Sequence, residues 1–179
     1  MPVLVIDGDA VGHEVLTQTR IKEQIRAAFG DSVFNSGGDV ERMALGRRVF
    51  GPDPEARRAR DQLEQIVHPA IRSEFSRLIG DARGSSDCRA VLLDAAVLLE
   101  SGWNDLCDAV VFVDAPEDVR RRRVIELRGW SEDQFRRRQA SQYPTTAKQS
   151  LSHATIDNSG SLDHAADQLE EIIRGISQE

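Results

Sequence analysis

Four short, unbroken apolar segments constrain the fold of this chain more than any other feature. They are VLVI at 3–6, VLL at 91–93, VVFV at 110–113 and ATI at 154–156, and an aspartate follows each of them at once. A continuous apolar run, without alternation of polar residues, is typical of a strand that is covered on both faces, as in a parallel sheet. Long helical stretches separate the runs. The sequence therefore predicts an α/β fold, with a parallel sheet flanked by helices.

The longest of these helical stretches carries a clear start signal and an internal interruption. Asp53 followed by Pro54 predicts a capped helix start, and apolar residues follow at helical spacing. Pro69 falls inside that pattern. Because proline removes a backbone donor and crowds the preceding turn, we expect a break or kink at Pro69 and a second helix that carries Phe75.

Length and charge narrow the class of protein. A chain of 179 residues has the size of one ordinary domain, and we expect residues 1–179 to form one. A net charge of −7 argues against a nucleic-acid partner held by bulk charge. The apolar runs are far shorter than the ~20 residues that a membrane span needs, and MPVLVIDGDA lacks the basic start of a signal peptide. Cys88 and Cys107 are too few for a metal knuckle or disulfide scaffold. We therefore expect a cytoplasmic protein.

Acidic side chains at the end of the first run are the first candidates for chemistry. Asp7 and Asp9 are two residues apart, and residues i and i+2 of a strand point to the same side. Both carboxylates are therefore expected to face one cleft at the carboxyl end of a strand, where open α/β sheets bind ligands. The alternative is that one of them caps a helix that begins near Ala10. His13 lies one turn into that helix, on the same side, although a lone helical histidine is more often a packing or surface residue.

A second acidic group follows the second run, in LLDAAVLLE at 92–100. Asp94 ends the predicted strand, and Glu100 follows on a short apolar element. A carboxylate at a strand end beside a phosphate site commonly orients a metal-bound water or a substrate hydroxyl. The alternative for both residues is a solvated turn.

Arginines gather after the third run. RRRR at 120–123, Arg128 and RRR at 136–138 lie on two predicted helices joined by the turn GWS at 129–131, and Ser131 with Gln134 forms a capping-box pattern for the second helix. Arginine binds phosphate well because its planar guanidinium donates in pairs. The segment therefore predicts either a lid over a nucleotide or, as the alternative, a solvated helix face.

Taken in order along the chain, these segments resemble the dephospho-coenzyme A kinase family of P-loop kinases. VIDGD, His68-Pro69, LLDAAVLLE, the arginine segment with its GWS turn, Lys148 and IDNSGS carry the resemblance, which covers essentially the whole chain. It implies a P-loop-kinase-like parallel sheet, a helical substrate-side region at about 31–80 and an arginine-rich lid at about 117–150. It also implies that ATP, with Mg²⁺, phosphorylates the ribose 3′-hydroxyl of dephospho-coenzyme A, the last step of coenzyme A biosynthesis.

The resemblance implies roles for individual residues. Asp9 matches the family's base or orienting group for the attacking hydroxyl, and Gly8 before it stands where the family usually has alanine. The expected substrate-binding residues are Asp7, His13, Arg42, His68, Asp94 and Glu100. The expected lid and phosphate residues are Arg123, Arg128, Arg138, Gln142 and Lys148, although a lid turn one residue shorter leaves open which arginine of 120–123 acts there. Asn158 and Gly160 match a turn beside the adenine, and Mg²⁺ is expected to arrive with ATP rather than in a site of the protein's own.

One part of the family pattern is missing. The resemblance implies a phosphate-binding loop, G-x-x-x-x-G-K-[ST], ahead of the first run, yet Lys22 follows Ile21 and Lys148 follows Ala147. The resemblance implies that the strand before this loop lies in the middle of the sheet, between the strands formed by the second and third runs. Without that strand, the two neighbouring strands would each have an edge with unpaired backbone groups. We expect an enzyme, a monomer or small homo-oligomer, whose N-terminal strand and loop are absent from this chain. The alternatives are a non-catalytic relative that binds dephospho-coenzyme A or a nucleotide without turnover, another nucleotide kinase, and a nucleic-acid binder.

Overall fold

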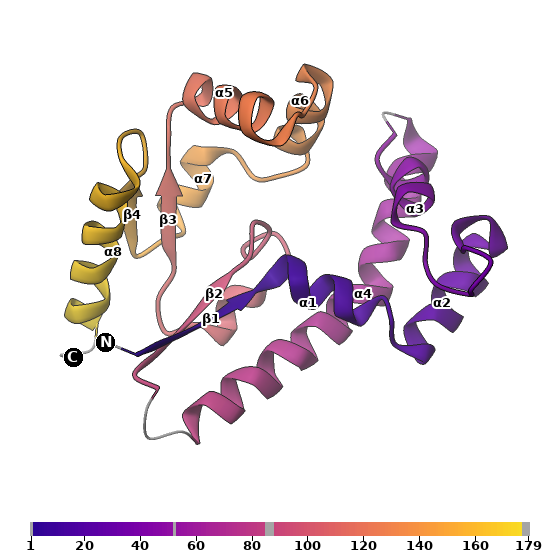
Figure 1. The fold of residues 1–179 in the computed structure, drawn as a ribbon, viewed down its shortest axis with the longest axis horizontal. Helices are drawn as coiled ribbons and strands as arrows, with labels where there is room; N and C mark the ends of the chain where they lie inside the picture. The colour runs from indigo at the N-terminus through magenta and orange to yellow at the C-terminus, as the bar shows by residue number, and fades with distance from the viewer. Residues whose placement is uncertain (1, 52, 85–87, 177–179) are drawn as a thin grey trace. The chain divides into compact units, whose positions relative to one another are not determined.

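Strands and helices alternate along the chain in the predicted α/β pattern (Figure 1). The structure, a computed structural model, describes residues 2–51, 53–84 and 88–176. Backbone contacts divide the chain into two compact units, residues 1–96 and 97–179, and each is described by itself. The strands are β1 (Val3–Asp7), β2 (Ala90–Asp94), β3 (Val111–Asp114) and β4 (Ala154–Asp157). They coincide with the four apolar runs, which confirms their assignment as strands.

The four strands form two parallel pairs. β1 pairs with β2 in a register that sets Asp7 beside Asp94, and β3 pairs with β4 in a register that sets Asp114 beside Asp157. Within the described residues no strand pairing joins β2 to β3.

Several strand side chains are more exposed than a continuous apolar run predicts. Ile6 and Ile156 are buried, but Leu4, Val5 and Val113 are 39%, 60% and 54% exposed. A sheet of two strands consists of edges alone and has no central strand. The prediction of strands buried on both faces is therefore wrong at these three positions.

Helices of the first unit pack around one long helix, α4 (Pro54–Arg83). The others are α1 (Gly8–Val15), α2 (Thr19–Phe29), the 3₁₀ turn η1 (Asp31–Val33) and α3 (Arg42–Val49). Buried residues recur four apart in the short helices, as in Ile21 and Ile25 of α2, which places an apolar stripe on one face of each. Phe75 of α4 and Ile25 are fully buried, so the core of this unit lies along α4.

The helix α4 runs through Pro69 without a break. Its start is the predicted one, because the Asp53 carboxylate accepts a hydrogen bond from the Ala56 amide at 2.8 Å. The predicted second helix is wrong: residues on both sides of Pro69 belong to the same helix. Pro69 and Gln65, the residue whose carbonyl loses its helical partner, are both exposed, and buried Ile71 and Phe75 hold the following turns in place.

Residues 97–179 contain the 3₁₀ turn η2 (Trp103–Leu106), α5 (Glu117–Arg128), α6 (Glu132–Ala140), α7 (Thr145–Ser150) and α8 (Leu162–Ile176). The capping box of Ser131 and Gln134 is present at the start of α6, as predicted. An ion pair of Arg121 with Glu132, at 2.9 Å, joins α5 to α6, and α8 lies alongside β4 (Figure 1). Across the described ranges, no helix is long and apolar enough to span a membrane.

Candidate functional site

The carboxyl end of β1 turns directly into helix α1. Asp7 is the last residue of the strand, and its Oδ1 accepts a hydrogen bond from the Ala10 amide at 3.0 Å, which caps the helix. Asp9 therefore lies in the first helical turn rather than on the strand. The expectation that strand alternation aligns Asp7 with Asp9 is wrong, and the capping alternative is correct for Asp7.

Asp9 and His13 stand one turn apart on α1, on the same face of the helix, as predicted for His13. Both are exposed, and so is Asp94 at the end of β2. In the part of the chain that the structure describes, no hydrogen bond or ion pair engages these three side chains. The edge formed by Asp7, Asp9 and Asp94, here called the acidic edge, thus presents carboxylate oxygens to a ligand.

Gly8 allows the two strand ends to approach each other. A Cβ at Gly8 would lie 2.8 Å from the backbone oxygen of Asp94 and 3.1 Å from the Cβ of Ala95. Such contacts are too short for a methyl group, so an alanine at this position would displace the end of β2. The glycine that replaces the family's alanine is therefore a steric requirement of this acidic edge.

The two other predicted substrate-binding residues of this unit lie on α3 and α4. Arg42 is the first residue of α3 and is exposed. His68 is half-buried on α4 and borders an open hollow also lined by Glu64, Gln65 and Pro69. Burial lowers the pKa of His68, and the negative charge of Glu64 opposes that shift only in part.

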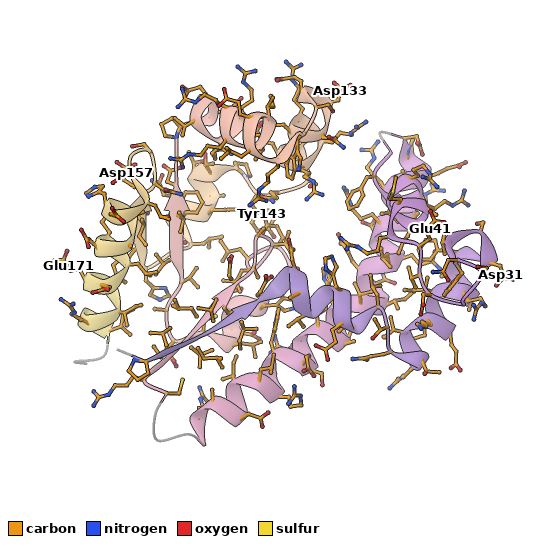
Figure 2. The ribbon with its side chains drawn as sticks, in the orientation of Figure 1. Asp31, Glu41, Asp133, Tyr143, Asp157 and Glu171 are labelled. Carbon is orange, nitrogen blue, oxygen red and sulfur yellow. The ribbon has the colours of Figure 1, made fainter. Side chains whose placement is uncertain are left out.

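Glu100, Gln142 and Lys148 come together in the second unit. Glu100 Oε1 accepts hydrogen bonds from the Lys148 ammonium at 2.9 Å and from the Tyr143 amide at 2.7 Å. The Lys148 ammonium also donates to Gln142 Oε1 at 3.2 Å. The side chains of Glu100 and Lys148 are only 14% and 12% exposed. The cluster thus fastens the segment after α6, marked by Tyr143 in Figure 2, to the segment before η2.

The predicted lid arginines differ in what they contact. Arg138 lies over the Trp130 ring, 4.4 Å from its centroid, and Arg123 donates to backbone oxygens of residues 158 and 160. Arg128, the last residue of α5, is exposed and makes no ion pair among the described residues. In the run at 120–123, three side chains donate hydrogen bonds to oxygens of the protein, namely those of Arg120, Arg121 and Arg123.

The turn that follows β4 is held by several hydrogen bonds. The Asn158 amide donates to the Asp114 carbonyl at 2.7 Å, and the Ser159 amide donates to the Asp157 carboxylate at 2.8 Å. The hydrogen bonds from Ser159 lower the pKa of Asp157. Gln168 of α8 binds both the amide and the carbonyl of Asp157 at 3.0 Å. Sequence reasoning missed Gln168, because its contact with Asp157 depends on how α8 packs beside β4, and one polar residue in a helix does not signal such packing.

Across the described ranges, no three or more side chains of His, Cys, Asp and Glu are arranged so that they could hold a metal ion. Mg²⁺ needs no such cluster, since it commonly keeps several waters and binds one or two carboxylates together with phosphate oxygens.

The sequence of this chain is similar to the sequences of one known protein family. The sequence model of the dephospho-CoA kinase family matches residues 1–164. The chain belongs to the dephospho-CoA kinase family. A dephospho-CoA kinase of Symbiobacterium thermophilum is 40% identical over 167 residues, which cover 93% of this chain and 68% of the relative. A second dephospho-CoA kinase, of Corynebacterium diphtheriae, is 35% identical over 161 residues, which cover 89% of this chain and 78% of the relative.

A solved dephospho-CoA kinase, from Campylobacter jejuni, has the same fold: it is 20% identical in sequence and superposes with a TM-score of 0.63, over 97% of this chain and 86% of that one. The crystal structure of TT1252 from Thermus thermophilus is 30% identical in sequence and superposes with a TM-score of 0.72, over 97% of this chain and 84% of that one. The fold predicted from the resemblance, parallel strands flanked by helices in the manner of a P-loop kinase, is therefore confirmed.

Proposed function

We propose that this chain acts in the phosphorylation of dephospho-coenzyme A, at the ribose 3′-hydroxyl, with ATP as the phosphoryl donor. Membership of the dephospho-CoA kinase family supports the reaction. The observation that carries the assignment of a catalytic group is the exposed Asp9 carboxylate, unengaged by other described side chains, at the carboxyl end of a parallel strand. Ligands of α/β sheets bind at this end of the strands.

Asp9 is the proposed general base or orienting group. Its carboxylate accepts the proton of the attacking 3′-hydroxyl as that oxygen approaches the γ-phosphorus of ATP in line with the leaving oxygen. His13, one turn further along α1, and Asp94 are proposed to hold the ribose and orient its hydroxyl. Phosphoryl transfer depends chiefly on positioning and charge neutralisation, which is the chemistry that such side chains supply.

Substrate binding is assigned to further residues that the resemblance implies. We propose that Arg42 and His68 contact dephospho-coenzyme A, together with Asp7 and Glu100. Arg128 is the best supported of the phosphate-binding arginines, because it is exposed and forms no ion pair among the described residues. The expected phosphate residues also include Arg123, Arg138, Gln142 and Lys148, and the expected nucleotide residues are Asn158 and Gly160.

Mg²⁺ is proposed to accompany ATP and to neutralise charge on its phosphates. The exposed carboxylate of Asp94 fits a supporting role, in which it orients a metal-bound water. We further propose a cytoplasmic protein that is a monomer or a small homo-oligomer.

The test is a direct assay of phosphoryl transfer. The purified chain is incubated with dephospho-coenzyme A and γ-labelled ATP in the presence of Mg²⁺, and the product is identified by mass spectrometry and ³¹P NMR. The proposal expects label on the 3′-hydroxyl at a rate that falls sharply in Asp9→Asn. Label on another hydroxyl, or the same rate in the variant, would refute the assignment.

A binding protein without turnover is the second candidate. It is favoured by one observation: neither Lys22 nor Lys148 belongs to a G-x-x-x-x-G-K-[ST] loop, so the 179 residues contain none. This candidate expects saturable binding of dephospho-coenzyme A by calorimetry and no labelled product. Binding together with labelled product favours the kinase.

A further inference from the structure

We propose that Arg123 is a positioning residue, which fixes the turn at 157–160 so that Asn158 presents its side chain to the nucleotide base. The inference rests on the proposed function, because that function brings a nucleotide to this turn. It gives Arg123 a role other than the phosphate contact that the lid motif suggests.

The guanidinium of Arg123 connects two segments that are far apart in sequence. From α5, its Nη1 donates to the Asn158 carbonyl at 2.6 Å and its Nη2 donates to the Gly160 carbonyl at 3.1 Å. Two nitrogens of one rigid, planar group therefore bind carbonyls on both sides of Ser159. Such a bidentate contact fixes the direction of the turn as well as its position.

The remaining contacts restrain the same turn from its other sides. Gln168 of α8 holds Asp157 through both its amide and its carbonyl, and the Asn158 amide is bound by the Asp114 carbonyl of β3. In Figure 2, Asp157 marks the place where β4 ends beside α8. The turn is thus tied to β3, α5 and α8, and Arg123 provides the tie to α5.

This arrangement leaves the Asn158 side chain available. Its backbone amide and carbonyl are both engaged, whereas no hydrogen bond of the described residues uses its carboxamide. A carboxamide offers one acceptor and two donors, which matches the adjacent donor and acceptor on an edge of adenine. Because a group that is already in place loses less freedom on binding, fixing the turn should raise affinity for the base.

The test uses three variants of the whole chain. Arg123→Met removes both hydrogen bonds, Arg123→Lys retains the charge but cannot bind both carbonyls in the same planar way, and Arg174→Met is the control. Arg174 is an exposed arginine of α8, outside the residues assigned to the lid, so its variant loses the same charge. The measurements are the KM for ATP, the KM for dephospho-coenzyme A, the preference for ATP over GTP, and hydrogen exchange of the amides at 158–160.

Arg123→Met should raise the KM for ATP roughly 10-fold and lower the ATP preference, as expected from the loss of charge-assisted hydrogen bonds. The KM for dephospho-coenzyme A should stay unchanged, and the amides at 158–160 should exchange faster. Arg123→Lys should fall between wild type and Arg123→Met. Arg174→Met should resemble wild type in the KM for ATP, the ATP preference and the exchange rates.

A fall in kcat without any change in the KM for ATP, the ATP preference or the exchange rates would overturn the proposal and return Arg123 to the phosphates. Equal effects of Arg174→Met and Arg123→Met would overturn it as well, since bulk charge would then explain them. If the wild-type chain gives no labelled product, the proposed kinase function fails, but the role of Arg123 can still be tested. The affinity for ATP and the exchange rates of the amides at 158–160 are then compared between wild type and Arg123→Met. If neither quantity changes in the variant, the proposed role of Arg123 is refuted.

Discussion

The acidic edge of residues 1–96 and the arginine-rich segment at 117–150 use charge in opposite ways. Asp9 and Asp94 are exposed, and no ion pair among the described residues engages them. Many charged groups of the second region are instead bound by the protein itself, as in Arg121 with Glu132 and Arg123 with the carbonyls of the 157–160 turn. A charge without a protein partner is available to a ligand, whereas a partnered charge holds the structure in place.

Motif matching does not separate these two uses. Glu100 and Asp9 were both expected at the site from the resemblance, yet only Asp9 is exposed. Glu100 is nearly buried and binds Lys148 and the Tyr143 amide. If the contrast holds, substitution of Asp9 should change catalysis and leave folding intact, and substitutions in the Glu100–Lys148 cluster should lower the stability of the fold.

Asp9→Asn tests the first half of this contrast and has the largest expected effect. The amide cannot accept the hydroxyl proton, so the rate of dephospho-coenzyme A phosphorylation should fall at least ~100-fold, within the range for loss of a general base. The free energy of unfolding should change little, because Asp9 is exposed. Initial rates and urea unfolding measure the two quantities.

The matched control for Asp9→Asn is Glu23→Gln, at an exposed carboxylate on α2. It should keep both the rate and the stability of the wild type. An Asp9→Asn protein with the wild-type rate would remove Asp9 from the mechanism.

Lys148→Met tests the second half. It leaves the Glu100 carboxylate buried without its cation, which should lower the free energy of unfolding by roughly 2–3 kcal/mol, below the full cost of a broken buried pair because both side chains retain some exposure. Urea unfolding measures the loss. The double variant Glu100→Gln/Lys148→Met should regain part of it, since no buried charge remains.

Arg174→Met provides the comparison for an exposed ion pair. Arg174 and Glu170 lie 2.8 Å apart on α8 but are 70% and 68% exposed, so breaking this pair should change stability little. Equal losses in Lys148→Met and Arg174→Met would show that burial does not set the strength of the Glu100–Lys148 pair.

Gly8→Ala sharpens the description of the acidic edge. The new methyl group would meet the Asp94 backbone oxygen at 2.8 Å, so the free energy of unfolding should fall by about 1–3 kcal/mol, the usual cost of overpacking. Gly12→Ala on the same helix is the matched control. Its nearest neighbour would be Ile71 Cδ1 at an ordinary 3.8 Å, and alanine favours a helix, so this variant should be slightly more stable. The opposite order in urea unfolding would contradict the steric argument.

Local signals in the sequence predicted the secondary structure well. The four apolar runs became strands, Asp53 caps α4, and the capping box starts α6. These features depend on neighbouring residues, which a single sequence displays directly. Pro69 was misjudged because the packing of Ile71 and Phe75 outweighs one missing hydrogen bond, and packing depends on residues distant in the sequence.

The chemistry of the site was predictable only as a set of residue types. The resemblance implied a lid role for Arg123 and a nucleotide contact for Asn158, but these two residues are 35 positions apart and only the fold brings them into contact. Gln168 gave no sequence signal for the same reason. Side-chain partners thus determine which charged residues remain open to a ligand, and a motif does not contain that information.

His68→Gln has the smallest expected effect and tests burial in the first unit through pH. Burial lowers the pKa of His68 in the folded state, so the unfolded chain binds more protons than the folded one around and below the ordinary histidine pKa of about 6.5. The contribution of His68 to stability is therefore full above pH 6.5 and declines as the pH falls from there toward the folded-state pKa. His68→Gln should flatten this part of the curve of unfolding free energy against pH, while His164→Gln, at an exposed histidine of α8, should not. A wild-type slope that survives in His68→Gln would show that another group produces it and would place His68 in contact with water.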